Sequence, residues 1–166
     1  MNDVIKKIFI DSRGSLTKFA SSNKFIIKQI VYIKSKKKFT FRGLHWQIKP
    51  FLEKKIVFCL KGKAIDISIN LNKKSKHFGI IQKKIISPNS KSGIMIKENW
   101  AHGILTLENN TEIVYFSNQL YKQNYSRGIR YNDSKFELNI KKPKVISERD
   151  VNWSDFWFYK KYQKKK

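Results

Sequence analysis

The fold of this chain is decided by residues 55–71, which read KIVFCLKGKAIDISINL. An apolar run is interrupted at Lys61-Gly62-Lys63, and isoleucine then alternates with polar residues. Alternation with a period of two is typical of a strand with one buried face, and glycine between polar residues indicates a turn. The stretch therefore predicts two strands, Lys55–Leu60 and Ala64–Leu71, joined by a tight turn.

Further segments along the chain repeat this apolar or alternating pattern, and polar turn residues separate them. They are Ile26–Ile33, Phe39–Gln47, Phe78–Ile86, Gly93–Ile96, His102–Leu107 and Glu112–Phe116. Many short strands at close spacing predict an all-β sandwich or barrel, and the missing alternation of strands with helices argues against a Rossmann domain. Helices are expected only near Ser15–Asn23 and from Ser147 onward, with Ser147 as the N-cap.

Length and composition predict one domain over residues 1–166. We expect a core over about residues 25–140 and a C-terminal helical segment over about residues 147–160. The chain is 40% hydrophobic and has a single cysteine, Cys59, within an apolar run. A lone buried thiol suits a reducing compartment. The sequence has neither an apolar stretch of about 18 residues nor a secretory N-terminus, so we expect a cytoplasmic protein with no membrane span.

The formal charge of +24 raises the alternative of a non-catalytic basic β-sandwich that binds nucleic acid or another polyanion. The lysines are spread over every segment, and no basic groove with interleaved aromatics is visible. We therefore interpret most of them as solvated surface residues and expect no nucleic-acid partner. The positive field should still attract anions, including diphosphate groups.

The strand Phe39–Gln47 contains the motif Arg42-Gly43-Leu44-His45-Trp46-Gln47. Strict alternation would place Phe41, Gly43, His45 and Gln47 on one side of it and Arg42, Leu44 and Trp46 on the other. A histidine beside a tryptophan on a β-surface can be shielded from water, which helps a proton carrier. The alternative is a structural histidine.

Eight motifs in order resemble the dTDP-4-dehydrorhamnose 3,5-epimerase family over roughly Asp11 to Asp155. They are Arg42-Gly43-Leu44-His45-Trp46-Gln47, Pro50-Phe51, Lys55-Ile56-Val57, Gly62-Lys63-Ala64-Ile65-Asp66, Ala101-His102-Gly103-Ile104-Leu105, Glu112-Ile113-Val114-Tyr115, Arg127-Gly128-Ile129-Arg130-Tyr131-Asn132-Asp133 and Ser147-Glu148-Arg149-Asp150. The resemblance implies a cupin-like jelly roll with short peripheral helices. It also implies a homodimeric, cofactor-free isomerase acting on a nucleotide-diphospho-4-keto sugar, with dTDP-4-dehydro-6-deoxy-D-glucose as the first choice.

Inverting a carbon beside a ketone requires one group to remove a proton and another to return one to the opposite face, while a cation meets the enolate oxygen. His45 is the candidate base, Tyr115 the opposite-face acid and Lys55 the cation. The resemblance makes Asp150 the carboxylate partner of His45. Asp66 either orients Lys55 or His102, or belongs to a solvated polar face.

The expected substrate-binding residues are Arg42, Arg13, Gln47, His102, Tyr121 and Arg130, with the three arginines as candidates for the diphosphate. Tyr121 is equally well explained by packing. Many cupins hold iron or manganese through two histidines two residues apart. Here Gly43 and Gln47 flank His45, and the chain has three histidines in all, so we expect no metal site.

The chain departs from the family pattern at positions tied to nucleotide recognition and the dimer edge. Family members usually carry an acid where this chain has Lys18, and Asn-x-Ser where it has Tyr32-Ile33-Lys34. These departures leave the nucleotide and the sugar open. Inversion at C3 or C5 alone, on a related nucleotide sugar, is the alternative within the same class.

Overall fold

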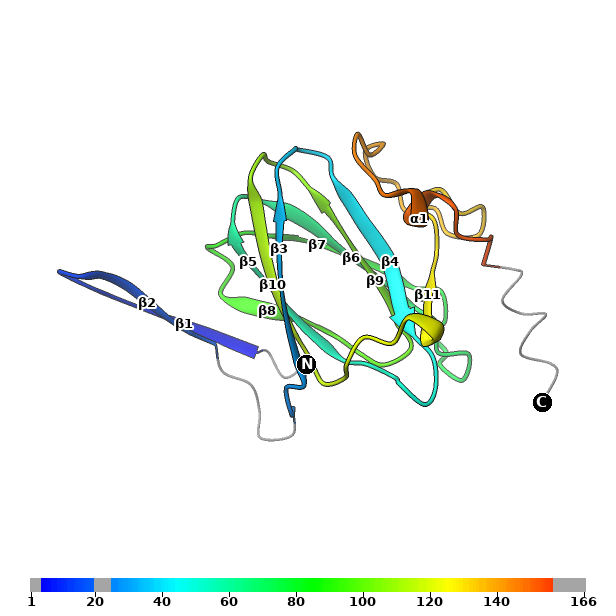
Figure 1. Ribbon diagram of the computed structural model, residues 1–166, viewed down its shortest axis with the longest axis horizontal. Helices are drawn as coiled ribbons and strands as arrows, with labels where there is room; N and C mark the ends of the chain where they lie inside the picture. The colour runs from blue at the N-terminus through cyan, green and yellow to red at the C-terminus, as the bar shows by residue number, and fades with distance from the viewer. Residues whose placement is uncertain (1–3, 20–24, 157–166) are drawn as a thin grey trace.

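The computed structural model describes residues 4–19 and 25–156. Within these residues, two antiparallel sheets face each other (Figure 1), with strand orders β2-β1-β8-β5-β10-β3 and β11-β4-β9-β6-β7. The first sheet contains β1 (Val4–Asp11), β2 (Gly14–Phe19), β3 (Gln29–Ser35), β5 (Lys55–Lys61), β8 (Ser92–Ile96) and β10 (Thr111–Ser117). The second contains β4 (Phe41–Gln47), β6 (Ala64–Asn70), β7 (Ile81–Ile86), β9 (Trp100–Thr106) and β11 (Ser126–Gly128). The predicted all-β sandwich is confirmed.

The two strands of residues 55–71 form as expected but lie in opposite sheets. β5 pairs with β8 and β10, whereas β6 pairs with β7 and β9. The turn at Gly62, whose φ is 75°, therefore carries the chain from one sheet to the other. This corner encloses an inner core that includes Val57, Cys59, Ile104 and Ile113. Burial raises the pKa of the Cys59 thiol to about 11, as expected for a packed thiol.

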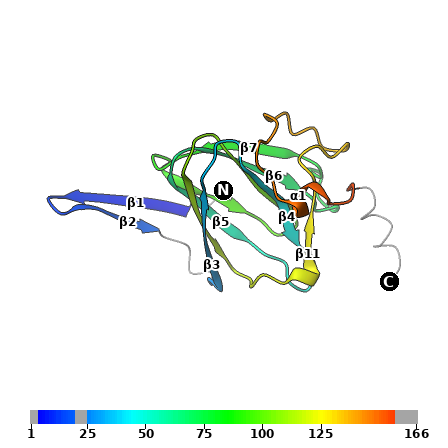
Figure 2. The same ribbon diagram turned by 45° about the horizontal axis from the view of Figure 1, so that its top comes forward.

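The C-terminal segment covers the outer face of the five-stranded sheet. Phe136, Leu138 and Phe156 share a buried cluster with Phe41 and Trp46. Figure 2 shows the short helix α1 (Glu148–Val151) beside β4. The segment closes one sheet face, and it also brings residues 147–156 close to the motif that contains His45.

The sides of β4 differ from the prediction. Phe41 packs with Leu44 and Trp46 rather than lying on the side of His45. The register against β9 explains this, because Arg42 pairs with Ile104 but His45 already pairs with His102. One extra residue on β4 forms a bulge, which moves Arg42 to the inner side.

Only glycine fits at the bulge. Gly43 has a φ of +123°, and a Cβ there would lie 2.5 Å from the Gly103 Cα. Two backbones therefore approach closely beside the predicted base.

The predicted helices are only partly present. Gly14–Phe19 is strand β2, paired with β1, so the helix expected from Ser15 is wrong for residues 15–19; residues 20–23 lie outside the described ranges. All six residues of β2 pair with β1, from Gly14 opposite Asp11 to Phe19 opposite Lys6, and this pairing fixes an extended backbone. Near the C-terminus, α1 has Ser147 as its N-cap, as predicted, but covers four residues. Residues 157–160 of the expected helical segment also lie outside the described ranges.

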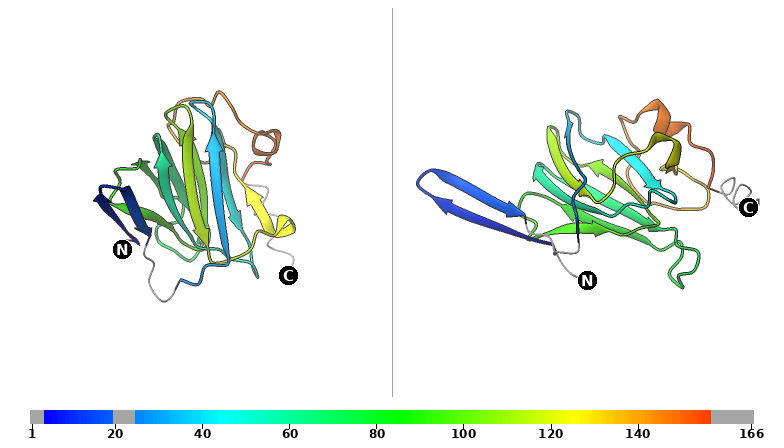
Figure 3. Two further views of the ribbon diagram at one scale, coloured as in Figure 1. Left: turned by 60° about the vertical axis from the view of Figure 1, so that its left-hand side comes forward. Right: turned by 60° about the horizontal axis from the view of Figure 1, so that its bottom comes forward.

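The hairpin of β1 and β2 projects from the sandwich (Figures 1 and 3). Its tip is set by Asp11, whose carboxylate accepts hydrogen bonds from the backbone N–H and the guanidinium of Arg13. None of the helices within residues 4–19 and 25–156 has the length and hydropathy that a bilayer crossing requires.

Replacing Gly43 with alanine should destabilise the protein by about 2–4 kcal/mol, because the new methyl group meets β9 backbone at a φ that L-residues rarely adopt. Gly14→Ala is the matched control, since Gly14 has nearly the same φ, +122°, but nothing within 4 Å of its added Cβ. Urea unfolding of both variants measures the difference. Equal losses would contradict a close approach of β4 to β9 at this position.

Candidate active site

Polar side chains from both sheets gather on the inner faces, at one end of the sandwich. His45 on β4 lies opposite His102 on β9. His45 is close to Gln47, where β4 ends, and His102 is close to Trp100, where β9 begins. Lys55 opens β5 and pairs in register with Ser117, the last residue of β10. Tyr115 precedes Ser117 on the same side of β10 and pairs with Val57 of β5. Charged and aromatic groups from four strands thus lie at the edge of an otherwise apolar core.

His45, which is partly exposed, pairs with the buried Asp150 between β4 and α1. The His45 Nε2 atom lies 2.6 Å from the Asp150 Oδ1 atom, and the Gly43 N–H donates to Oδ2 at 3.2 Å. Burial opposes ionisation of Asp150, but the hydrogen bonds from His45 and Gly43, with the charge of His45, hold its pKa below the usual value. With Nε2 donating to the carboxylate, Nδ1 is left as the imidazole nitrogen that can accept a proton.

A second histidine-carboxylate pair lies beside the first. The His102 Nε2 atom is 2.7 Å from the Asp66 Oδ2 atom, and both side chains are buried. Asp66 shares its face with Ser68 and Asn70, as predicted, but this face is buried rather than solvated. Of the two partners expected for Asp66, the structure brings it to His102 and not to Lys55.

Lys55 and Tyr115 approach each other on the opposite sheet. The Lys55 ammonium lies 5.5 Å from the centre of the Tyr115 ring, and Lys55 is only 8% exposed. Its ion-pair partner is Glu53, at 2.8 Å. Burial, followed by the charge of Glu53 and the proximity of Tyr121, raises the pKa of Tyr115 to about 12. The phenol therefore remains protonated at neutral pH and loses its proton only to a strong base.

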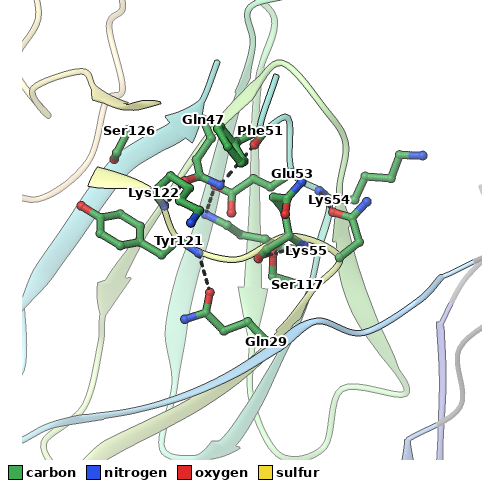
Figure 4. Close-up of polar contacts among 12 residues, drawn as sticks. Gln29, Gln47, Phe51, Glu53, Lys54, Lys55, Ser117, Tyr121, Lys122 and Ser126 are labelled. Atoms are coloured by element: carbon green, nitrogen blue, oxygen red, sulfur yellow. Dashed lines mark hydrogen bonds and ion pairs between the residues drawn. The ribbon is translucent and has the colours of Figure 1, made fainter. Parts of the chain in front are cut away.

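Gln47 ties together the two loops that border this end of the sandwich (Figure 4). Its amide nitrogen donates to the carbonyl oxygens of Phe51 and Leu120, and its side-chain oxygen accepts from the Lys122 N–H at 2.6 Å. These bonds fix loop 48–54, which leads to Lys55, against segment 118–122, which follows β10. The structure thus gives the Gln47 amide a bridging position between loops, in contact with backbone groups.

Arg149 connects α1 to Tyr121 and β11. Its guanidinium donates to the Tyr121 hydroxyl at 2.7 Å and to the Ser126 Oγ at 3.1 Å. It also stacks 5.0 Å from the ring of Trp153, which in turn lies edge-on to His45. Tyr121 is 48% exposed, so its ring lines the rim of the site rather than the core.

The three predicted diphosphate arginines are not brought together. Arg42 lies on the inner side of β4 and reaches the Ser35 Oγ at 3.5 Å, close to His45 in the chain. Arg130 pairs with Asp155. Arg13 lies at the tip of the projecting hairpin, where its side chain is 87% exposed and pairs with Asp11, away from the site within its own chain.

Sequence reasoning missed three side chains at the site: Glu53, Arg149 and Trp153. The spacing of Glu53 to Lys55, two residues apart in an extended segment, places both on one side and was an available signal. Arg149 belongs to the motif that contains Asp150, but nothing in the sequence showed its contacts or those of Trp153, since these depend on where the C-terminal segment packs. In the described part of the chain, no three His, Cys, Asp or Glu side chains group closely enough to hold a metal ion.

Comparison with known proteins agrees with this geometry. The family model described as dTDP-4-dehydrorhamnose 3,5-epimerase matches residues 3–157. The chain belongs to this family. Its members are isomerases, and the predicted resemblance is confirmed.

Individual relatives match over most of their length. A dTDP-4-dehydrorhamnose 3,5-epimerase from Shigella flexneri is 30% identical over 159 residues, covering 94% of this chain and 82% of the relative. The crystal structure of the Bacillus anthracis epimerase with TDP and PPi bound superposes with a TM-score of 0.82, at 25% identity, covering 91% of each chain. A 3′-monoepimerase from Streptomyces bikiniensis shares the fold, with a TM-score of 0.82 at 17% identity over 96% of this chain and 85% of that one.

Replacing Asp150 with asparagine should destabilise the protein by about 1–3 kcal/mol at neutral pH, because the charge-assisted bond to His45 is lost. The lowered pKa of Asp150 means that its contribution is present above the unfolded-state value and is lost as the pH falls through the folded-state value. The difference between the two proteins should therefore shrink below about pH 4. Urea unfolding at pH 7 and pH 3 measures it.

The matched control is Asp11→Asn, which removes a carboxylate whose pKa is also lowered, by the hydrogen bonds of Arg13, but on the exposed hairpin. This control should have little effect at either pH. An Asp150→Asn penalty that is the same at pH 3 and pH 7 would show that the carboxylate charge does not stabilise the fold.

Proposed function

We propose that this epimerase inverts C3 and C5 of dTDP-4-dehydro-6-deoxy-D-glucose and forms dTDP-4-dehydro-L-rhamnose. The observation that carries the proposal is the placement of two separate proton-handling groups on facing sheets. The imidazole of His45, held by Asp150, belongs to one sheet, and the phenol of Tyr115, beside Lys55, belongs to the other. A 4-keto sugar ring bound between the two sheets at this end of the sandwich would present one face to each group.

The first half of the reaction is proton removal. The ketone at C4 makes the hydrogens on both neighbouring carbons acidic, because the electron pair left behind delocalises onto the oxygen. Nδ1 of His45 accepts the proton, and Asp150 stabilises the imidazolium that results. Lys55 meets the developing oxyanion in a site where water cannot screen its charge, so its electrostatic effect is large. No redox or metal chemistry is needed for this step.

The second half is proton return from the opposite face. Tyr115 donates its phenolic hydrogen to the carbanion carbon, and the electron pair of the O–H bond remains as a phenolate next to the Lys55 ammonium. A phenol whose pKa is about 12 is a weak acid, yet an enolate carbon is basic enough to take its proton. Exchange of both groups with solvent resets the site for the second carbon.

Substrate binding is proposed for the residues that line the rim. His102 is held by Asp66 for contact with the sugar, Tyr121 lies at the outer edge, and Arg42 lies on the same strand as His45, on the inner side. Arg130 and Gln47 are engaged with Asp155 and with loop backbone, so we assign them contacts at the margin of the substrate. Inversion of one carbon alone remains the alternative, because the monoepimerase from Streptomyces bikiniensis has the same fold.

We further propose that two copies of the chain form a homodimer through the β1–β2 hairpin. Ile10 is 82% exposed and Phe9 51% exposed on this projecting element, and Ile30 on β3 is 61% exposed. Such an apolar arm is unstable in water unless something covers it. In a dimer it would bring Arg13 to the second copy, where its guanidinium could meet the diphosphate. A cytoplasmic location is proposed with it, because Cys59 is a free buried thiol.

Incubation with dTDP-4-dehydro-6-deoxy-D-glucose in D2O, followed by NMR of C3 and C5, tests the reaction. His45→Asn should slow deuterium incorporation at both carbons by about 100-fold or more, because it removes the proposed base that Asp150 holds in place. Tyr115→Phe should reduce product formation more than proton loss. His77→Asn, in an exposed loop, is the control and should retain the normal rate. Normal incorporation by His45→Asn would rule out His45 as the base.

Analytical ultracentrifugation tests the dimer. Ile10→Lys should weaken association, since it places a charge in the apolar arm, whereas Ile85→Lys, at a position 61% exposed on β7, should leave the dimer intact. Mixing inactive His45→Asn subunits with Arg13→Ala subunits should restore activity if Arg13 acts across the dimer, because one site of each mixed pair is then complete. A monomeric wild-type protein would contradict the proposal.

A further inference from the structure

The ion pair between Glu53 and Lys55 is unusual for a chain with so many lysines. Side chains of the other acidic residues that pair with lysine are exposed by 19–50%, whereas Glu53 and Lys55 are exposed by 13% and 11%. The two charges lie 2.8 Å apart at the entrance to the proposed catalytic end of the sandwich. Surface ion pairs contribute little, but an ammonium ion removed from water needs a partner to stay charged and in place.

The position of this pair ties it to the proton donor. The same ammonium that Glu53 holds lies 5.5 Å from the centre of the Tyr115 ring. Loop 48–54, which carries Glu53, is itself fixed by the bonds from Gln47 to Phe51 and Leu120. The carboxylate is therefore set in place before substrate binds.

We propose that Glu53 is a positioning residue of the epimerase reaction: its ion pair holds the Lys55 ammonium beside the Tyr115 ring and so fixes the cation and the proton donor relative to each other. This role rests on the proposed function. Without Glu53, the flexible lysine stem would sample other rotamers, and the enolate oxygen would meet a cation whose position is less defined.

Glu53 also influences how readily the phenol ionises. Its negative charge opposes formation of a second negative charge on Tyr115, in the same direction as burial does. The titratable side chains that face the phenol come from several elements, while the β3 residues on this face do not titrate. Glu53, Lys55 and Tyr121 act on the phenol from nearby. The five-stranded sheet and α1 contribute the pairs His45–Asp150 and His102–Asp66, and Arg42 lies on the inner side of β4.

The test compares Glu53→Gln with Glu98→Gln, its matched control. Glu98 pairs with Lys54, the neighbour of Lys55, at 3.5 Å, but this pair is exposed, and Glu98 is not among the groups that raise the pKa of Tyr115. Glu53→Gln should lower kcat about fivefold or more with KM changed less than about twofold, because the cation is used mainly in the transition state. Glu98→Gln should match the wild type.

Titration of Tyr115 distinguishes a positioning role of Glu53 from a purely structural one, because a purely structural role would leave the pKa of Tyr115 unchanged. The absorbance of tyrosinate is followed against pH for each protein and for its Tyr115→Phe counterpart, and the difference reports Tyr115 alone. Glu53→Gln should titrate about half to one pH unit lower than the wild type, since an unbalanced ammonium then faces the phenolate. Glu53→Asp, which keeps the charge, should stay close to the wild type.

A kcat equal to that of Glu98→Gln overturns the proposal, and so does a reduced kcat with an unmoved Tyr115 titration. The titration needs no substrate, so it tests the role of Glu53 separately from the proposed epimerase activity. Wild-type protein that exchanges no sugar hydrogens contradicts the proposed function, whereas an unmoved titration in Glu53→Gln contradicts the role of Glu53.

Discussion

The bond between the Asp150 carboxylate and the His45 imidazole is the contact on which the site depends. It joins residues 105 positions apart in the chain and holds the C-terminal segment against β4. The same carboxylate also accepts from the Gly43 N–H, at the bulge that sets the inner side of β4. One buried charge therefore determines where the imidazole lies and which of its nitrogens is free, and it links α1 to β4.

In the six-stranded sheet, the charged group is the Lys55 ammonium, which lies beside the Tyr115 ring. The catalytic end of this sheet must keep an ammonium ion and a protonated phenol side by side among apolar residues. Glu53 balances the ammonium, and burial keeps the phenol neutral. The two sheets thus hold one base and one acid, each with its own partner. Gln47 on β4 bonds to the backbone of Leu120 and Lys122, which follow β10, and so links the two sheets at this end.

Much of the fold follows from the sequence, because alternation in Ala64–Leu71 and the turn residues around it are local signals. The sides of β4 were not predictable in this way. The bulge at Gly43 depends on the close approach of Gly103, which is 60 residues further along the chain. The helix expected from Ser15 was wrong for a related reason, since pairing with β1 outweighs the local preference there.

The site shows the same division between local and long-range information. Strand register places the residues named from motifs within each sheet, with His45 opposite His102 and Lys55 near Tyr115, and the packing of the two sheets brings both groups to one end of the sandwich. The partner of Lys55 was not identified, although the position of Glu53 two residues earlier was an available signal. That both side chains are buried together depends on the path of loop 48–54, which the bond from Gln47 to Phe51 fixes. Arg13 is the clearest departure: it was expected at the diphosphate, yet its place at the tip of a projecting hairpin separates it from the site of its own chain.

A crystal structure of the His45→Asn variant with dTDP-4-dehydro-6-deoxy-D-glucose bound tests the central claim most directly. We predict that the C4 oxygen lies within hydrogen-bond distance of the Lys55 Nζ atom, and that the side chain at position 45 and the Tyr115 hydroxyl lie on opposite faces of the sugar ring. A sugar ring with both groups on the same face, or one bound away from this end of the sandwich, would contradict the mechanism.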